Sequence, residues 1–127
     1  MNTKSKMVLA VVAGAALGAA AVQGLHAQAK LKAYSVVEAE TIGTLPSDYL
    51  PTARKAIEAA HGRALRTFNG RVVSIEGTPA PKHAGIVEWD SVDDAVAFYK
   101  SKAWTDLAPQ RDKAQKTIRR YVVEVEK

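Results

Sequence analysis

Residues 1–29 differ in composition from the rest of the chain, and this break decides how much of the chain is left to fold. Lys4 and Lys6 give the start a positive charge, and residues 7–22 then carry only small or apolar side chains. A basic start followed by a short apolar run is the layout of a secretory signal peptide. The sequence therefore predicts a signal peptide over residues 1–29 and one folded domain over residues 30–127.

The same apolar run is where a membrane anchor would have to lie. A helix that crosses a bilayer needs about 20 apolar residues, whereas this run is shorter and rich in Ala and Gly. Ala27-Gln28-Ala29 has small residues at the two positions that signal peptidase requires. We expect cleavage after Ala29, with Ala27 as the second choice, and a periplasmic or secreted product without stable membrane association. Anchoring by an uncleaved N-terminus is the alternative.

The basic charge of the chain does not predict a nucleic-acid partner. The formal net charge is +5, and two of the lysines belong to the leader. The densest basic stretch contains Lys113, Lys116, Arg119 and Arg120 without interleaved aromatic residues, whereas surfaces that bind single strands combine cations with aromatic side chains that stack on bases. We interpret this stretch as a solvated helix end, where cations suit the helix dipole.

The chain contains no cysteine. Disulfides, thiol nucleophiles and cysteine-bound metals are therefore excluded, and an exported domain of this size must rely on its core or on a partner chain. His61 and His83, the two histidines after the leader, lack a metal-ligand spacing. We expect no metal and no cofactor.

Hydrophobic periodicity predicts strands at 33–41, 83–90 and 118–126, because β-branched residues alternate there with polar ones. Two shorter runs, 63–68 and 71–76, flank Asn69-Gly70, which is typical of a tight hairpin turn. They are interpreted as a hairpin or as one strand with a kinked end.

Three helical stretches are expected between these strands. The first begins at Ser47 as N-cap and ends at Gly62, with Leu50, Ala53, Ile57 and Ala60 on its apolar face. The second begins at Ser91, which forms a capping pattern with Asp94, and has Val92, Ala95, Val96 and Tyr99 on its apolar face. The third covers residues 104–116 and is interrupted near Pro109.

The order strand, helix, strand, strand, helix, strand is that of a ferredoxin-like βαββαβ fold. The predicted class is therefore α+β, with a four-stranded antiparallel sheet and two helices on one face. The other face is left bare, and the usual remedy is to bury it against a second copy around a two-fold axis. We expect a homodimer.

Four segments resemble the DUF1330 family: AYSVVEAE, AAHGR, IVEWDSVDDAVAFYKSKAWTDLAPQRDKA and RRYVVEVE. The resemblance extends over nearly all of residues 30–127 and implies a dimeric α/β barrel, the architecture of antibiotic-biosynthesis monooxygenases and muconolactone isomerases. Members typically carry Gly-Gly-Arg after the first helix, whereas this chain keeps only Gly62-Arg63. Because the activity of the family is not established, the resemblance implies a fold and no chemistry.

Candidate catalytic residues come from strand ends. Val37-Glu38, Val87-Glu88 and Val123-Glu124 repeat one phrase, and a period of two lets the three glutamates share the face away from the helices. A dimer would enclose that face, and burial raises the pKa of a carboxyl toward the range useful for proton transfer. The candidates are Glu38, Glu88, His61 and Tyr34. Antiparallel pairing separates Glu38 from the other two glutamates, and the alternative is that they face water or pair with Arg119 or Arg120.

The candidate ligand-binding residues are Trp89, Tyr99 and Arg111. The alternative for the two aromatic residues is that they make core or dimer contacts. The alternative for Arg111 is that it anchors the last helix. The alternative for His61 is a structural role at the helix C-terminus.

Two function classes follow from these candidates. The first is a small-molecule binding or structural dimer, which we favour; the second is a cofactor-free proton-transfer enzyme, isomerase-like or monooxygenase-like. A closed pocket with a titratable group would favour the enzyme.

Overall fold

The computed structural model describes residues 30–127, so the predicted leader lies outside the described residues. Residues Leu31–Lys127 form one compact unit, and no helix described in it is long and apolar enough to cross a membrane. The elements are β1 (Ala33–Thr41), α2 (Tyr49–Ala59), β2 (Arg63–Leu65), β3 (His83–Trp89), α3 (Val92–Lys100), α4 (Lys102–Thr105), α5 (Ala108–Ala114) and β4 (Gln115–Glu124).

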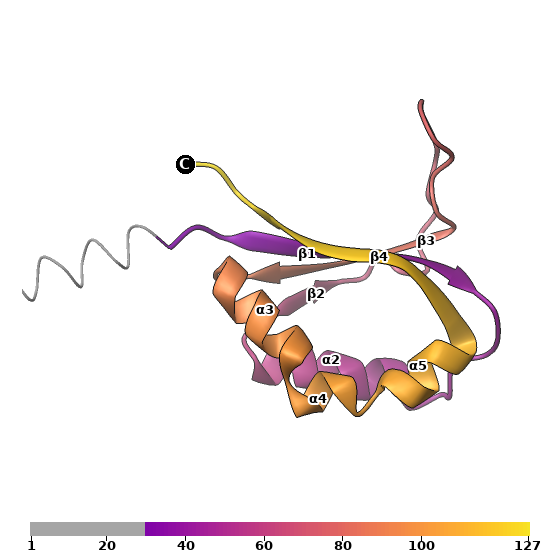
Figure 1. Ribbon diagram of the computed structural model, residues 1–127, viewed down its shortest axis with the longest axis horizontal. Coiled ribbons are helices and arrows are strands. Elements are labelled where there is room, and N and C mark those ends of the chain that lie inside the picture. The colour runs from indigo at the N-terminus through magenta and orange to yellow at the C-terminus, as the bar shows by residue number, and fades with distance from the viewer. Residues whose placement is uncertain (1–29) are drawn as a thin grey trace, which may run out of the picture. The chain divides into compact units, whose positions relative to one another are not determined.

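The four strands form one antiparallel sheet in the order β2-β3-β1-β4, and β1 runs opposite to both of its neighbours. The helices lie together on one face of this sheet and leave the other face uncovered (Figure 1). The predicted α+β class and ferredoxin-like arrangement are confirmed. The helical layer holds the two short helices α4 and α5 in addition to α2 and α3, because the predicted third stretch breaks before Ala108 and places Pro109 in the first turn of α5.

Helix α3 begins as predicted, since the Ser91 hydroxyl accepts a hydrogen bond of 3.1 Å from the backbone N–H of Asp94. Helix α2 differs in register from the prediction. Its buried side chains are Tyr49, Ala53 and Ile57, while Leu50 is exposed. The spacing of four residues from Tyr49 onward places the apolar stripe one residue earlier at the start of the helix than expected, so Tyr49 enters the core in place of Leu50.

Helix α2 ends in a Schellman motif. The N–H of Gly62 bonds to the carbonyl of Ile57 at 2.9 Å, and the N–H of His61 bonds to that of Glu58 at 3.0 Å. This motif requires a left-handed residue after the helix, which is usually glycine. Here it is His61, with φ of 66°. The single glycine of the Gly62-Arg63 pair therefore follows the left-handed position and does not occupy it.

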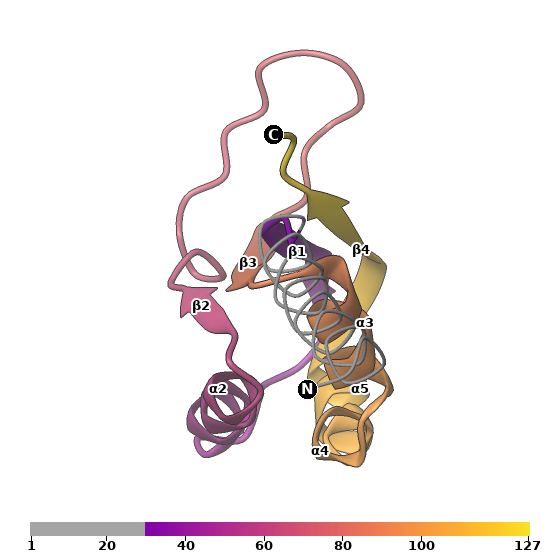
Figure 2. The ribbon, with the colours of Figure 1, turned by 90° about the vertical axis from the view of Figure 1, so that its left-hand side faces the viewer.

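The predicted hairpin at Asn69-Gly70 is not formed. Strand β2 covers only Arg63–Leu65, and a turn between Thr67 and Gly70 then carries the chain away from β3. The segment 71–82 stands off from the sheet on the side opposite the helices (Figures 1 and 2), and it exposes Val73 and Ile75. The β-branched residues at 71–76 predicted a strand, but β2 is the edge of the described sheet and no strand within residues 30–127 lies beside them.

The core lies between the helices and the sheet. Trp89, Phe98, Tyr99 and Trp104 form an aromatic cluster in which neighbouring ring centroids are 5.1 to 5.9 Å apart. Trp89 is completely buried, and Tyr49, Ile57, Val87 and Leu107 pack in the same cluster. The aromatic residues therefore join α3 and α4 to the end of β3.

Candidate functional site

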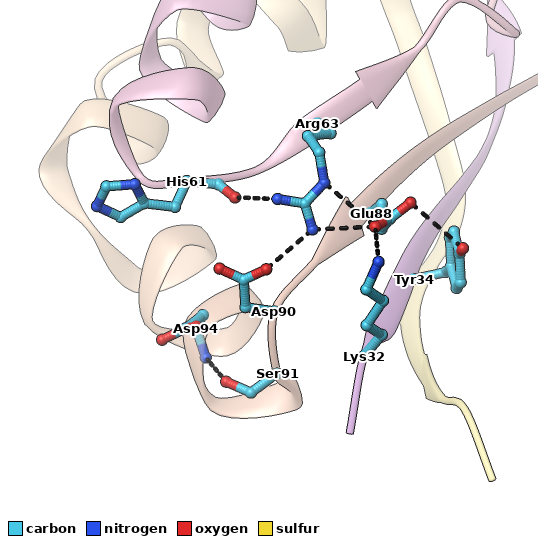
Figure 3. A network of polar contacts seen from close by, with 8 residues as sticks. All are labelled: Lys32, Tyr34, His61, Arg63, Glu88, Asp90, Ser91 and Asp94. Carbon is cyan, nitrogen blue, oxygen red and sulfur yellow. Dashed lines mark hydrogen bonds and ion pairs between the residues drawn. The ribbon is translucent and has the colours of Figure 1, made fainter. Parts of the chain in front are cut away.

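Two of the four candidate catalytic residues, Glu88 and Tyr34, meet at one end of the uncovered sheet face (Figure 3). The Glu88 carboxylate accepts hydrogen bonds from Lys32 Nζ at 2.9 Å and from Arg63 Nη2 at 3.0 Å. Tyr34 donates to it at 3.4 Å. Arg63 also bonds to Asp90 at 3.0 Å and to the carbonyl of His61 at 3.3 Å. We call Lys32, Tyr34, Arg63, Glu88 and Asp90 the Glu88 cluster.

The Glu88 cluster does not have the electrostatics of a proton-transfer site. Hydrogen bonds from Lys32 and Arg63 hold the pKa of Glu88 below its ordinary value, because they stabilise the charged form. His61 contributes only its backbone carbonyl, and its ring points away from the cluster (Figure 3). The cluster instead ties the short edge strand β2 to β3 and to the start of β1.

Glu38 lies at the other end of the uncovered face. It accepts two hydrogen bonds from Arg119, its cross-strand neighbour, at 2.6 and 3.0 Å. These bonds hold the pKa of Glu38 below its ordinary value, against a smaller opposing effect of burial. The sequence analysis expected Glu38 to lie apart from Glu88, and it gave pairing of the glutamates with Arg119 or Arg120 as the alternative. In the structure Glu38 is separated from Glu88 and pairs with Arg119.

The expectation that three glutamates share the uncovered face is wrong for Glu124. It lies directly opposite Ala33 in the sheet, and opposed residues point to the same side. Ala33 is buried on the helix side, and Val122, two residues before Glu124, packs against the core. The shared Val-Glu dipeptide does not determine which face of the sheet its glutamate occupies. The alternation of side chains along β4 is shifted by one residue relative to that along β1 and β3.

A cavity of about 280 Å³ lies on the helix side of the sheet, between α2 and the strands. Its walls are mainly apolar, and the exposed lining residues Leu50, Arg66 and Asn69 mark the mouth. We call it the Arg120 cavity after the cation at its buried end. It is lined by Val37, Tyr49, Leu50, Ala53, Arg54, Ile57, Ala64, Leu65, Arg66, Phe68, Asn69, Gly85, Ile86, Val87, Tyr99, Trp104, Gln115 and Arg120.

The buried end of the cavity combines aromatic rings with a guanidinium. Arg120 lies 4.7 Å from the ring centroid of Trp104 and 5.3 Å from that of Tyr99. Its Nε is a buried nitrogen without a hydrogen-bond partner in the described part of the chain. Burial, and to a lesser degree the charge of Arg111, lowers the pKa of Arg120. Burial also raises the pKa of the Tyr99 hydroxyl, which shares a hydrogen bond of 2.7 Å with Ser35.

The candidate ligand-binding residues divide between this cavity and the core. Tyr99 lines the cavity, whereas Trp89 lies in the core and is not among the lining residues. Arg111 is buried beside the cavity, where its guanidinium stacks at 4.1 Å on Trp104 and bonds to the Tyr49 hydroxyl at 3.4 Å. This geometry matches the anchoring role that was the alternative for Arg111.

Arg120 is the residue that the sequence interpretation missed. The basic stretch was taken as a solvated helix end, but residues from Gln115 onward form β4. Arg119 and Arg120 then point to opposite faces of the sheet, because side chains alternate along a strand. The alternation of Val122 and Arg120 was the signal that could have placed Arg120 under the helices. Within residues 30–127, no three His, Asp or Glu side chains gather as a metal site.

Comparisons with known proteins bear on the fold. A family model described as a domain of unknown function, DUF1330, matches residues 26–125. The solved structure of a protein of unknown function from Rhodopseudomonas palustris is similar, with 12% identity, 76% of this chain and 82% of that chain covered, and a TM-score of 0.54. No curated protein matches the chain.

A second solved structure is that of SnoaB, a cofactor-independent oxygenase from Streptomyces nogalater. It has 9% identity, covers 76% of this chain and 95% of that chain, and has a TM-score of 0.48. A dimeric protein of unknown function with a ferredoxin-like fold, from Bacteroides fragilis, has 10% identity, 75% and 95% coverage, and a TM-score of 0.36. Likenesses this remote carry no conclusion about the chemistry of this chain.

Proposed function

The chain belongs to the DUF1330 family, a domain of unknown function, and we propose that it is a small-molecule-binding protein whose ligand occupies the Arg120 cavity. The observation that carries this proposal is the cavity, about 280 Å³ of space with mainly apolar walls and a few polar side chains among its lining residues. Ligand sites are typically concave and apolar with a small number of polar groups, and this volume is near the lower end of their range of about 300–1,000 Å³. The ligand is therefore small.

The same geometry does not favour the proton-transfer alternative. The cavity lining contains no Asp, Glu or His among the described residues. The two candidate carboxylates, Glu38 and Glu88, lie on the opposite face of the sheet and are held in the ionised form by their cationic partners. An acid–base residue with a pKa near neutral pH is what such an enzyme needs.

Binding in the Arg120 cavity is tested by filling it. Ala64 lines the cavity, so the larger ring of Ala64→Phe would occupy ligand space, whereas Ala97→Phe adds the same ring at an exposed position of α3. Calorimetric titration with benzamide and 2-naphthamide should show binding to the parent and to Ala97→Phe, and at least about tenfold weaker binding to Ala64→Phe, about 1.4 kcal/mol. Equal affinities for all three proteins would overturn the proposal.

We also propose that the protein is a homodimer through the uncovered sheet face. This face carries partly or largely exposed apolar side chains from all four strands, namely Val36, Leu65, Ile86, Tyr121 and Val123. The segment 71–82, with exposed Val73 and Ile75, rises on the same side (Figure 1). A contiguous apolar surface of this kind is usually buried in an assembly.

Export remains a proposal from the sequence. Expression of the full chain in a Gram-negative host should give a soluble periplasmic product that starts near Lys30. N-terminal sequencing and fractionation check it. An uncleaved chain in the membrane fraction would support the anchored alternative instead.

A further inference from the structure

Arg120 is a half-buried cation whose Nε is buried, and it lines the space in which the proposed ligand lies. Ion pairs in residues 30–127 involve Lys32, Arg63 and Arg119, and neither Arg120 nor Arg111 takes part in one. Stacking on Tyr99 and Trp104 stabilises part of the positive charge of the Arg120 guanidinium. Its Nε–H is buried, and no residue from 30 to 127 accepts a hydrogen bond from it.

A buried N–H without an acceptor is costly, so such groups are usually hydrogen-bonded. Among the described residues, Asp112 is the carboxylate that acts on the pKa of Arg120, and its effect is the weakest of those named for that pKa. Arginine cannot relieve this cost by losing its proton, since it stays charged in proteins. Arg111, whose guanidinium lies 4.1 Å from the ring centroid of the same Trp104, adds positive charge and not a neutralising group. Arg120 thus makes its end of the cavity electropositive, while the walls are mainly apolar and carry Arg54 and Arg66 as further cations.

Resting on the proposed function, we propose that the Arg120 cavity selects small monocarboxylates with an apolar body. The carboxylate accepts hydrogen bonds from the Arg120 guanidinium, and the body lies against Val37, Val87 and Phe68. A planar guanidinium matches a carboxylate in bidentate geometry. One guanidinium carries one positive charge, which matches one carboxylate, and the volume of about 280 Å³ limits the body to the size of one or two rings.

The test compares acids with their neutral amides. Titration calorimetry at pH 7 measures benzoate against benzamide and 2-naphthoate against 2-naphthamide, with protein purified from expression of the full chain. Each acid should bind at least about tenfold more tightly than its amide, about 1.4 kcal/mol. This preference should disappear in Arg120→Met and persist in Arg119→Met, which removes the adjacent cation on the opposite face of the sheet.

A second measurement does not depend on the variant folding. The Nε–Hε signal of Arg120 in a proton–nitrogen spectrum of the parent protein should shift on addition of 2-naphthoate and stay in place on addition of 2-naphthamide. A variant that retains the charge, Arg120→Lys, should keep part of the preference for the acid.

The outcomes separate the two proposals. Equal binding of acids and amides, or a preference for acids that persists in Arg120→Met, would overturn the role of Arg120 and leave the cavity as a neutral ligand site. If neither acids nor amides bind, both the anion site and the proposed function fail.

Discussion

The indole Nε1 of Trp89 donates a hydrogen bond of 2.9 Å to Ser35 Oγ, and the same oxygen lies 2.7 Å from the Tyr99 hydroxyl. Trp89 and Ser35 are both almost completely buried. One serine on β1 thus satisfies the polar atoms of two aromatic residues from β3 and α3. It allows these rings to fill the core without leaving an unpaired donor.

Replacing Ser35 tests this role. Ser35→Ala leaves the buried Trp89 N–H without an acceptor, and an unsatisfied buried donor costs about 1–3 kcal/mol. We expect the free energy of unfolding to fall by that amount in urea denaturation. Ser74→Ala, which removes a hydroxyl from the exposed loop, is the matched control and should leave stability nearly unchanged. A loss shared by both variants would show that the hydrogen bond at Ser35 is not the cause.

His61 offers a test of the backbone at the end of α2. Its φ of 66° is a left-handed conformation that costs a residue with a side chain about 1–2 kcal/mol. Replacing His61 with glycine removes this cost, but part of the gain is lost because glycine is more flexible in the unfolded state. His61→Gly should therefore raise stability by about 0.5–1 kcal/mol. His61→Val, with a β-branched side chain, should lower it. Thermal unfolding measures both, and a destabilised His61→Gly would contradict the assignment.

The two ion-paired glutamates make the stability of the folded protein depend on pH in the acid range. Their pKa values are lowered in the folded protein, by Arg119 for Glu38 and by Lys32 and Arg63 for Glu88. Below the ordinary glutamate pKa of about 4.3 the unfolded chain then binds more protons than the folded one, so stability falls as pH falls. The contribution is fully present above that pKa and is lost as pH passes below the lowered values.

Glu88→Gln and Glu38→Gln should therefore flatten the dependence of stability on pH in the acid range, with Glu126→Gln as a control at an exposed position near the C-terminus. Denaturation curves recorded between pH 7 and pH 3 measure the slope. A slope equal to that of the parent in both variants would mean that these pairs are not formed in solution.

Pairing through the uncovered sheet face predicts a dimer that a single charge can disrupt. Val36 lies in the central strand β1, between Ile86 and Tyr121. Val36→Lys would bury an ammonium in the proposed interface and should shift the mass from that of a dimer to that of a monomer. Val96→Lys makes the same change on the outer surface of α3 and should leave the dimer intact. Light scattering distinguishes them, and a parent protein that is monomeric at micromolar concentration would refute the interface.

Much of the fold could be predicted from the sequence, because local signals agreed with the tertiary structure. Three signals were each compatible with only one structure: the alternating residues of β1, the Ser91 cap and the order of the elements. The hairpin at Asn69-Gly70 failed because a turn signal and β-branched residues do not create a partner strand. Tyr49 was missed because the apolar stripe of α2 was drawn through Leu50, and the N-cap is Asp48 instead of Ser47.

The site was less predictable than the fold, since it depends on which face each strand residue occupies. Glu38 and Glu88 were placed correctly on the uncovered face, but their partners make them structural ions. Arg120 escaped notice because a one-residue difference decides whether an arginine on β4 faces solvent, as Arg119 does, or the core. Register of this kind is set by tertiary packing and is only weakly encoded by a basic stretch.

A crystal structure of the protein with 2-naphthoate tests the central claim most directly, because it shows at once whether the Arg120 cavity is occupied and how. We predict density for the ring system between α2 and the sheet, with the carboxylate within hydrogen-bond distance of Arg120. Density for the ligand on the uncovered sheet face beside Glu38 or Glu88, with the cavity filled by its own side chains, would contradict the account.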